Sequence, residues 1–291
     1  MSAPAVFPSH ALIATRLRAA GCVFAEDEAR LLISAARTPA DLTAMVDRRA
    51  AGLPLEQVLG WAEFCGLRIA VDPGVFVPRR RTEFLVHQAV THASQAVQPA
   101  TRTEDGQTIT LARPLVVVDL CSGSGAVGAA LAAAFSRVEL HAVELDPVAV
   151  RCARRNVPAT GATVYEGDLY QPLPASLRGR VDILTANAPY VPTGEVALLP
   201  AEARVHEPLL ALDGGSDGLS ILRRVIAGAP EWLAPGGCLL AEATPHQWPQ
   251  LTEALTQAGL APRLVSCDEL NAAAVLGVKP LCDPVGPSPT G

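Results

Sequence analysis

Apolar residues recur at two different spacings along this chain, and the spacing changes near residue 115. Before that point, apolar residues lie three and four positions apart, at Leu12, Ile13, Leu17, Ala20, Leu31, Leu32, Ala35 and Ala36. This spacing is typical of amphipathic helices, so residues 9 to 50 are predicted to form a small helical bundle. Asp41, which follows the Thr38-Pro39 step, is expected to cap one of its helices.

The stretch 52–78 has a different character, because aromatic and β-branched residues are interrupted there by glycines. This pattern predicts a hairpin-like connector. Helical spacing resumes at Thr82, which we expect to cap the next helix. The polar residues 97–110 are predicted to form a surface loop.

From residue 115 onward, short apolar runs alternate with helical stretches. The predicted strands are 115–120, 138–143, 162–165, 181–186, 237–241, 264–266 and 274–278. Strands that alternate with helices form βαβ units, so we predict an α/β protein with a Rossmann-like parallel sheet covered on both faces. The tail 284–291 holds three prolines and is expected to be disordered.

Composition narrows the class of protein. A chain of 291 residues favours one large domain and a smaller one. The formal net charge of −6 argues against broad binding to phosphate backbones, which needs clustered Lys and Arg. The seven cysteines are scattered and include no C-x-x-C pair, so we expect neither disulfides nor a metal site. Neither a membrane-spanning apolar run nor a secretory signal is visible, which predicts a cytoplasmic protein without a membrane partner.

The first predicted strand of the sheet ends in an acid and a turn of small residues. Asp119 is followed by Leu120, and the turn consists of Cys121, Ser122, Gly123, Ser124 and Gly125. Small residues let a ligand approach the backbone closely, and the alanine-rich helix that follows offers free N–H groups. The segment therefore indicates a nucleotide site. A dinucleotide turn and a plain tight turn are alternatives that this segment alone leaves open.

Acids also close the next two predicted strands. Glu144 ends the second strand, where an acid typically accepts hydrogen bonds from ribose hydroxyls. Asp168 follows the third strand and can accept from an adenine amino group, while Leu169 can pack on the ring. Because the carboxyl ends of parallel strands meet at one edge of the sheet, these residues are expected to converge there.

The loop after the fourth predicted strand suggests the chemistry. Asn187, Ala188, Pro189 and Tyr190 resemble the Asn-Pro-Pro-Tyr motif of methyltransferases that act on planar nitrogens, such as amides and base amines. An amide nitrogen is a poor nucleophile because its lone pair is delocalised. The side-chain oxygen of Asn187 and the carbonyl of Ala188 can accept its two N–H bonds and localise that lone pair. Tyr190 can stack on the flat group. A simple strand-ending turn is the alternative.

The resemblance extends to a specific family over about residues 10 to 280. Residues 54–66, 76–83 and 206–218 resemble the inter-domain hairpin, the Ile-Pro-Arg-Pro-x-Thr-Glu segment and the stretch after the catalytic loop of protein-(glutamine-N5) methyltransferases. The family modifies the glutamine of the Gly-Gly-Gln tip in peptide chain release factors.

The resemblance implies a class I methyltransferase sheet that binds S-adenosyl-L-methionine, and catalysis by the 187–190 loop. Asp119, Glu144, Asp168, Leu169, Asn187 and the glycine turn would bind the cofactor. It also implies a substrate-recognition domain at 1–52, a hairpin connector at 53–81 and a methyltransferase domain at 82–283. A monomer with a protein substrate, and no stable nucleic-acid partner, is expected.

Three positions depart from the family pattern. Ala188 and Arg80 stand where the family has proline, and Cys121 stands where it has glycine. Ala188 keeps its carbonyl, so the proposed acceptor survives, although the turn loses restriction of its φ angle. A catalytically silent cofactor-binding relative therefore remains an alternative, as does a nucleic-acid amino-methyltransferase acting on adenine or cytosine.

The sequence assigns no catalytic role to two further features. The arginines 79–81 form the densest basic cluster, which predicts either a contact with an acidic partner or a solvated surface patch. Glu242 follows a predicted strand and is expected only to cap it.

Overall fold

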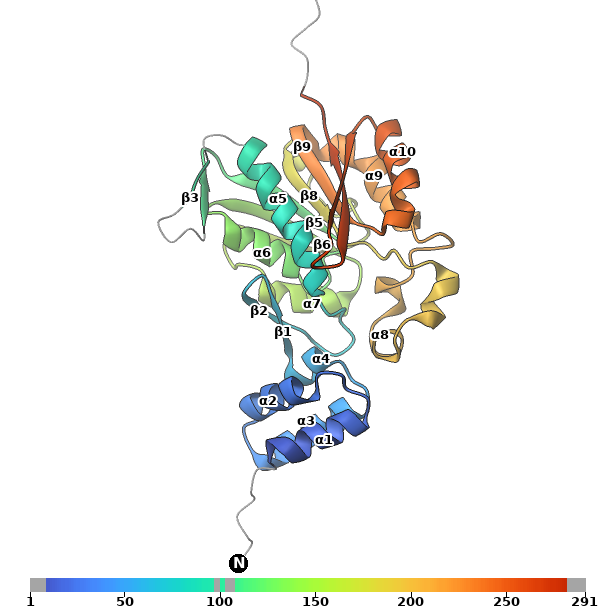
Figure 1. Cartoon of the computed structure of the whole chain (residues 1–291). Coiled ribbons are helices and arrows are strands. Elements are labelled where there is room, and N and C mark those ends of the chain that lie inside the picture. The colour runs from blue at the N-terminus through green and yellow to red at the C-terminus, as the bar shows by residue number, and fades with distance from the viewer. Residues whose placement is uncertain (1–8, 97–99, 103–107, 282–291) are drawn as a thin grey trace, which may run out of the picture.

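The computed structural model describes residues 9–96, 100–102 and 108–281. A cluster of helices lies at one end and a sheet flanked by helices at the other (Figure 1). The helices are α1 (His10–Ala19), α2 (Ala25–Ala35), α3 (Pro39–Ala50), α4 (Leu55–Leu59), α5 (Glu83–Ala96), α6 (Ala126–Ala134), α7 (Pro147–Asn156), α8 (Ala201–His206), α9 (Ser220–Trp232) and α10 (Trp248–Gln257). No helix within these described ranges is both long and apolar enough to cross a membrane.

The predicted helical bundle is present, with its own apolar core. Leu17, Leu32 and Leu42 are fully buried where α1, α2 and α3 meet, and the same core takes in Val58 of α4. The expected cap at Asp41 is wrong. Thr38 is the N-cap of α3, and its hydroxyl accepts the main-chain N–H of Asp41, which is the bond that a threonine at this position makes.

The predicted hairpin consists of β1 (Trp61–Phe64) and β2 (Leu67–Ala70), which pair antiparallel. The short helix α4 before it was not predicted. It follows Pro54 and ends at Gly60, whose φ of 81° is left-handed. Proline before a helix and glycine after it are recognised boundary signals, although a single turn carries too little periodicity to be detected.

The main sheet has seven strands in the order β10-β11-β9-β8-β5-β6-β7. They are β5 (Leu115–Leu120), β6 (Val138–Glu144), β7 (Ala162–Glu166), β8 (Val181–Ala186), β9 (Leu233–Glu242), β10 (Ala261–Cys267) and β11 (Ala272–Val278). All seven predicted strands exist, but the expectation of a parallel sheet is wrong at one place. β11 runs antiparallel to both β9 and β10, because β10 and β11 are joined by a tight turn instead of a crossover helix.

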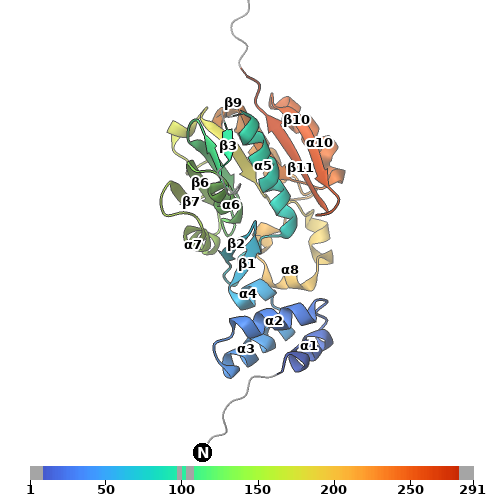
Figure 2. The ribbon, with the colours of Figure 1, turned by 60° about the vertical axis from the view of Figure 1, so that its left-hand side comes forward.

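Helices cover both faces of the sheet, which gives three layers (Figures 1 and 2). Residues of α5 and α6 share a core with Val117 and Leu240 on one face, and α7 packs on the same side. Residues of α9 and α10 share a second core with Val118 and Leu239. All residues of β5 and β8 are buried because these strands are covered on both sides, although Asp119, Asp182 and Thr185 interrupt their apolar residues.

Strand register brings the ends of five strands to one edge. Leu120 of β5 is paired with Val143 of β6 and with Ala186 of β8. Ala186 is in turn paired with Ala241 of β9, and Glu144 with Glu166 of β7. One row across the carboxyl edge therefore consists, in order, of Glu166, Glu144, Cys121, Asn187 and Glu242, and Gly167 follows directly after Glu166. The chain crosses from one half of the sheet to the other between β5 and β8, where ligands of such sheets bind.

The prediction of a surface loop at 97–110 is wrong in part. β3 (Ala100–Arg102) and β4 (Ile109–Leu111) form a short antiparallel ladder. Ile109 and Leu111 are buried in the core beside α6, so these two apolar residues explain the pairing. Residues 97–99 and 103–107 lie outside the described residues, as does the tail 284–291 for which disorder was expected.

Residues 193–212 form a segment that we call the cover segment. It contains η3 (Thr193–Leu198), α8 and η4 (Leu209–Ala211), and none of these three elements has a buried residue of its own. Polar contacts attach it to the N-terminal part of the chain. Glu202 pairs with Arg49 of α3, and the main-chain oxygen of His206 accepts from the buried Gln57 of α4. Both ribbon views place α8 between the helical cluster and the sheet (Figures 1 and 2).

Candidate functional site

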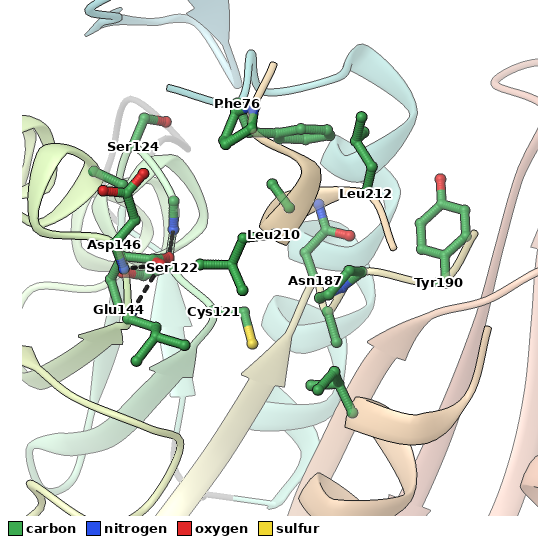
Figure 3. Close-up of a pocket in the computed structure, with 18 of the residues that line it drawn as sticks. Phe76, Cys121, Ser122, Ser124, Glu144, Asp146, Asn187, Tyr190, Leu210 and Leu212 are labelled. Carbon is green, nitrogen blue, oxygen red and sulfur yellow. Dashed lines mark hydrogen bonds between the residues drawn. The ribbon is translucent and has the colours of Figure 1, made fainter. Parts of the chain in front are cut away.

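A cavity of about 550 Å³ lies at the carboxyl edge of the sheet, under the cover segment. This volume is within the usual range for small-molecule sites. Its lining includes the predicted site residues Asp119, Cys121, Ser122, Gly123, Ser124, Glu144, Asp168, Leu169, Asn187, Ala188, Pro189 and Tyr190. Gly125 lies just behind it, as the N-cap of α6. The glycine turn and the 187–190 loop, which are far apart in the sequence, therefore face the same space (Figure 3).

The glycine turn is built from left-handed backbone. Cys121, Gly123 and Gly125 have φ angles of 53°, 54° and 79°. Glycine adopts this conformation without steric cost, whereas cysteine does so with strain. The conformation at Cys121 explains why the family pattern has glycine there. Burial and the neighbouring carboxylates raise the pKa of the Cys121 thiol, so the side chain that projects into the cavity is neutral (Figure 3).

Glu144 joins the end of β6 to this turn. One of its carboxylate oxygens accepts the main-chain N–H of Gly123 at 2.7 Å, and the other accepts those of Leu145 at 2.7 Å and Asp146 at 2.9 Å. Burial raises the pKa of the Glu144 carboxyl, while these three donors act in the opposite direction. The carboxylate is therefore fixed at the cavity wall, where it can also accept from the hydroxyl groups of a ligand.

Asp119 lies deeper than Glu144 and is held within the protein. Its carboxyl oxygens accept the main-chain N–H of Gly128 at 3.0 Å and the hydroxyl of Thr185 at 2.8 Å. The residue is 1% exposed, and burial raises its pKa to about 7. These bonds attach the first turn of α6 and the neighbouring strand β8 to the end of β5. Asp119 therefore stabilises the position of the glycine turn, which lies between β5 and α6.

The residues after β7 line the far end of the cavity. Asp168 is partly exposed and pairs with Arg224 of α9 at 2.6 Å. Leu169 is buried beside it in the left-handed conformation, with a φ of 49°. An acid and an apolar side chain thus lie together at the place where the sequence predicts contacts to an adenine ring.

The 187–190 loop presents two acceptors to the cavity. The side chain of Asn187 points into the open space (Figure 3). Within the described residues, neither its carboxamide nor the main-chain carbonyl of Ala188 makes a hydrogen bond. Asn187 is half-buried and lines the cavity, so both acceptors are free to accept hydrogen bonds from a ligand. Ala188 and Pro189 themselves are buried.

Tyr190 is held away from Asn187, at the other end of the loop (Figure 3). Its hydroxyl lies 3.2 Å from Glu242 and accepts a hydrogen bond from Arg81. Burial and the Glu242 carboxylate raise the pKa of Tyr190 to about 12, in spite of the nearby guanidinium. The hydroxyl therefore stays protonated, and it donates to Glu242.

This network corrects three expectations. Glu242 does not merely cap β9, because its carboxylate also accepts from Arg81 at 2.8 Å and from Thr82 at 2.6 Å. Thr82 does not cap α5, since its hydroxyl is the donor in the second of these bonds. The basic cluster is not a free surface patch either, because Arg81 pairs with Glu242 and Arg79 with the buried Glu207.

Several cavity residues were missed in the sequence. Phe76 comes from the stretch after β2, and Leu199, Leu210 and Leu212 come from the cover segment. Figure 3 shows Phe76, Leu210 and Leu212 opposite the glycine turn and Asn187. Short 3₁₀ turns have no extended periodicity, so no local signal marks these residues as part of a site.

The residues of the cavity suit an adenosyl cofactor with a charged amino-acid end. The hydroxyl oxygen of Ser122 is buried at the cavity and has no hydrogen-bond partner in the described part of the chain. An orphaned polar atom at a glycine turn is explained when a ligand supplies the partner. The carboxylates of Glu144 and Asp168 offer acceptors, and the apolar side chains offer surfaces for a ring.

Comparison with known proteins agrees with this fold and site. The hMettl16 catalytic domain, solved in complex with an RNA hairpin, superposes with a TM-score of 0.53 over 84% of this chain and 84% of that chain. The sequence identity is 15%, so this likeness concerns the fold alone. The family model described as "Methyltransferase small domain" matches residues 107–212. The protein is a class I, Rossmann-like methyltransferase, and its cofactor is S-adenosylmethionine.

Sequence relatives specify the family. The release factor glutamine methyltransferase of Geobacter sulfurreducens is 37% identical over 226 residues, which are 77% of this chain and 70% of the relative. The chain belongs to the release factor glutamine methyltransferase family. A 4-amino-L-phenylalanine/4-methylamino-L-phenylalanine methyltransferase of Streptomyces pristinaespiralis is 38% identical over 69% of this chain and 65% of that protein. Both relatives are methyltransferases, and their names show different acceptors.

Proposed function

We propose that this protein transfers the methyl group of S-adenosylmethionine to the side-chain amide nitrogen of a glutamine in a protein, namely the Gly-Gly-Gln glutamine of a peptide chain release factor. The observation that carries this proposal is the pair of unpaired acceptors at Asn187 and Ala188, which line the same cavity as the glycine turn. A primary amide has two N–H bonds, and this pair can accept both.

The roles of the individual residues follow from their places in the cavity. The bound cofactor supplies an electrophilic methyl group. Ser122, Glu144 and Asp168 bind and orient it at the glycine-turn side, and Leu169 packs on its ring. Asn187 and Ala188 orient the acceptor amide and keep its lone pair directed at the methyl group. Tyr190 bounds the acceptor end of the cavity, and its neutral phenol tolerates the positive charge that develops on the nitrogen.

The parts of the chain have distinct tasks in this proposal. The helical cluster recognises the protein substrate, the hairpin connects, and residues from 82 onward bind the cofactor and catalyse transfer. The chain acts as a monomer in the cytoplasm, where release factors are found. The core of the helical cluster also includes Val58 of α4, a residue of the proposed connector 53–81.

The test is incubation of the protein with labelled S-adenosylmethionine and a purified release factor. We expect label on the release factor, and fragment mass spectrometry should place one added methylene unit on the Gly-Gly-Gln glutamine. A release factor in which that glutamine is replaced by alanine is the matched control and should stay unlabelled. Label on the control protein at an equal rate would refute the glutamine assignment.

Further acceptors test the alternatives in parallel. 4-Amino-L-phenylalanine tests an aromatic amine, as in the Streptomyces pristinaespiralis relative. Duplex DNA and structured RNA test base amines, and we expect no transfer to them because the chain has a formal net charge of −6. Tight cofactor binding with no transfer to any acceptor would identify a silent relative and contradict the proposal.

A further inference from the structure

Arg81 donates hydrogen bonds both to the carboxylate of Glu242 and to the hydroxyl of Tyr190. Its Nε donates to Glu242 at 2.8 Å, and its terminal Nη2 donates to the hydroxyl of Tyr190. The same Glu242 oxygen lies 3.2 Å from that hydroxyl. The three groups close a triangle in which each side is a hydrogen bond. A guanidinium fork can make both of its contacts at once, which a single ammonium group cannot do with the same geometry.

The main chain at Tyr190 is fixed separately from its side chain. Gln247 donates to the Tyr190 carbonyl at 3.1 Å. Gly218 packs so closely on the same carbonyl that a Cβ atom there would lie 2.2 Å from its oxygen. The side-chain torsions of Tyr190 are restricted in addition by the hydrogen bonds of its hydroxyl with Arg81 and Glu242.

The ring also separates two spaces. Arg81 and Tyr190 line the cofactor cavity, and both also line a second cavity of about 310 Å³ next to it. Glu242, Ser266 and Asn271 form part of the wall of this second cavity. Because Tyr190 lines both cavities, we expect a ring whose hydroxyl is released to turn toward the second cavity and to widen the space beside Asn187.

We propose that Arg81 is a positioning residue, which holds the Tyr190 ring as the wall of the acceptor pocket. It acts through the Tyr190 hydroxyl, to which its Nη2 donates. This inference rests on the proposed function, because the acceptor pocket is where it takes effect. The side chain of Arg81 is 42% exposed but that of its partner Glu242 is only 8% exposed, so the pair also contributes to stability. The positioning role is therefore tested with readouts at Tyr190 and at the acceptor, which a purely stabilising role would not change.

The first test needs no acceptor. The chain has three tyrosines, so incorporation of 3-fluorotyrosine gives a fluorine NMR spectrum in which the Tyr190→Phe variant identifies one signal. We expect that signal to shift or broaden in Arg81→Ala and to stay unchanged in Arg80→Ala, the neighbouring arginine, which is exposed. An unchanged Tyr190 signal in Arg81→Ala would overturn the inference, even if no methyl acceptor were found.

The second test is a double-mutant cycle with the acceptor that the wild-type protein methylates. Arg81→Ala and Tyr190→Phe should each raise the acceptor KM by about tenfold, the usual effect of one lost hydrogen bond, and leave cofactor affinity unchanged. Because both changes break the same contact, the double variant should be no worse than either single one. Additive effects, or a loss confined to cofactor affinity, would overturn the inference. Absence of transfer by the wild-type protein would contradict the proposed function and leave the NMR result to decide on Arg81.

Discussion

The carboxylate of Glu144 accepts the main-chain N–H of Gly123 at 2.7 Å, so that the end of β6 is bonded directly to the turn that follows β5. The glycine turn is thereby fixed before any ligand arrives. Preorganisation of this kind reduces the ordering that binding would otherwise require. The same carboxylate lines the cavity, so one side chain both shapes the turn and offers an acceptor to a ligand.

Glu144→Ala is accordingly expected to weaken cofactor binding by roughly 10- to 100-fold, the range for a lost charge-assisted hydrogen bond, and calorimetry measures it. Glu166→Ala is the matched control. Glu166 is exposed and is paired with Glu144 in the neighbouring strand, so its removal should leave the cofactor affinity unchanged. Equal losses in both variants would show that the effect is not specific to Glu144.

Asn187→Ala should have the opposite profile. Because its carboxamide has no partner in the described part of the chain and faces the acceptor space, its loss should reduce kcat by roughly 100- to 1000-fold, as for other oriented polar groups in active sites. Cofactor affinity should change by less than about twofold. Steady-state kinetics and calorimetry on the same preparation separate these effects, and a large loss of cofactor affinity would contradict the division of roles between Asn187 and Glu144.

The raised pKa of Asp119 predicts a pH dependence of stability. An ordinary aspartate has released its proton by about pH 5, whereas Asp119, with a pKa of about 7, keeps it in the folded protein. The folded state therefore binds more protons than the unfolded chain between about pH 4 and pH 7, and the stability due to Asp119 is lost as the pH rises through this window.

Urea unfolding of the cofactor-free protein and of Asp119→Asn tests this dependence. Between pH 5 and pH 8, the wild type should lose at least about 1 kcal/mol more unfolding free energy than the variant. Subtracting the variant removes the contributions of the other titrating groups. A difference that is constant with pH would show that Asp119 ionises normally.

The left-handed backbone at Cys121 predicts the effect of substitution there. Cys121→Gly should keep or raise the melting temperature, by at most a few degrees, because the strain of about 1 kcal/mol is relieved while the unfolded chain gains freedom. Cys121→Val should lower it, since a β-branched residue fits this conformation poorly. Scanning calorimetry compares them, and equal melting temperatures for the two variants would contradict the strain argument.

The ion pair between α2 and α3 predicts a large effect in the helical cluster. Arg49 and Glu28 are both buried and lie 2.6 Å apart. Arg49→Ala leaves an uncompensated carboxylate and should destabilise the protein by about 3 kcal/mol. Arg30→Ala removes an exposed pair with Asp27 and should change stability by less than about 1 kcal/mol. Urea unfolding followed at the helical signal measures both, and similar values for the two variants would be inconsistent with the burial.

Much of the architecture could be predicted from the sequence because it depends on local patterns. The buried strands are rich in apolar residues, such as the run 115–118, and the helices between them carry regular spacing. The reversal of β11 was missed although the sequence carries a signal for it, because only seven residues separate the predicted strands 264–266 and 274–278, too few for a parallel crossover. The β3–β4 ladder was missed because its strands have only three residues each.

The site, too, contains residues that the sequence could place and residues that it could not. Asp119, Glu144 and Asn187 lie at strand ends, and strand ends of a parallel sheet meet at one edge by geometry. Arg81 and Glu242 are 161 positions apart, and their pairing has no local signal. The polar character of the arginine cluster was visible, but its partners depend on the tertiary fold. Phe76 reaches the cavity for the same reason.

The attachment of the cover segment to the helical cluster has a practical consequence for dissecting this enzyme. η3, α8 and η4 bury none of their own residues, and Glu202 and His206 attach this segment to Arg49 and Gln57. A truncated protein that starts after α4 would lack these two anchors and keep those at Glu207, which binds Arg79 and the main-chain N–H of Val77. Kinetic measurements on an isolated catalytic domain would thus describe a cavity whose cover is incompletely attached. Substrate recognition is therefore best studied on the intact chain.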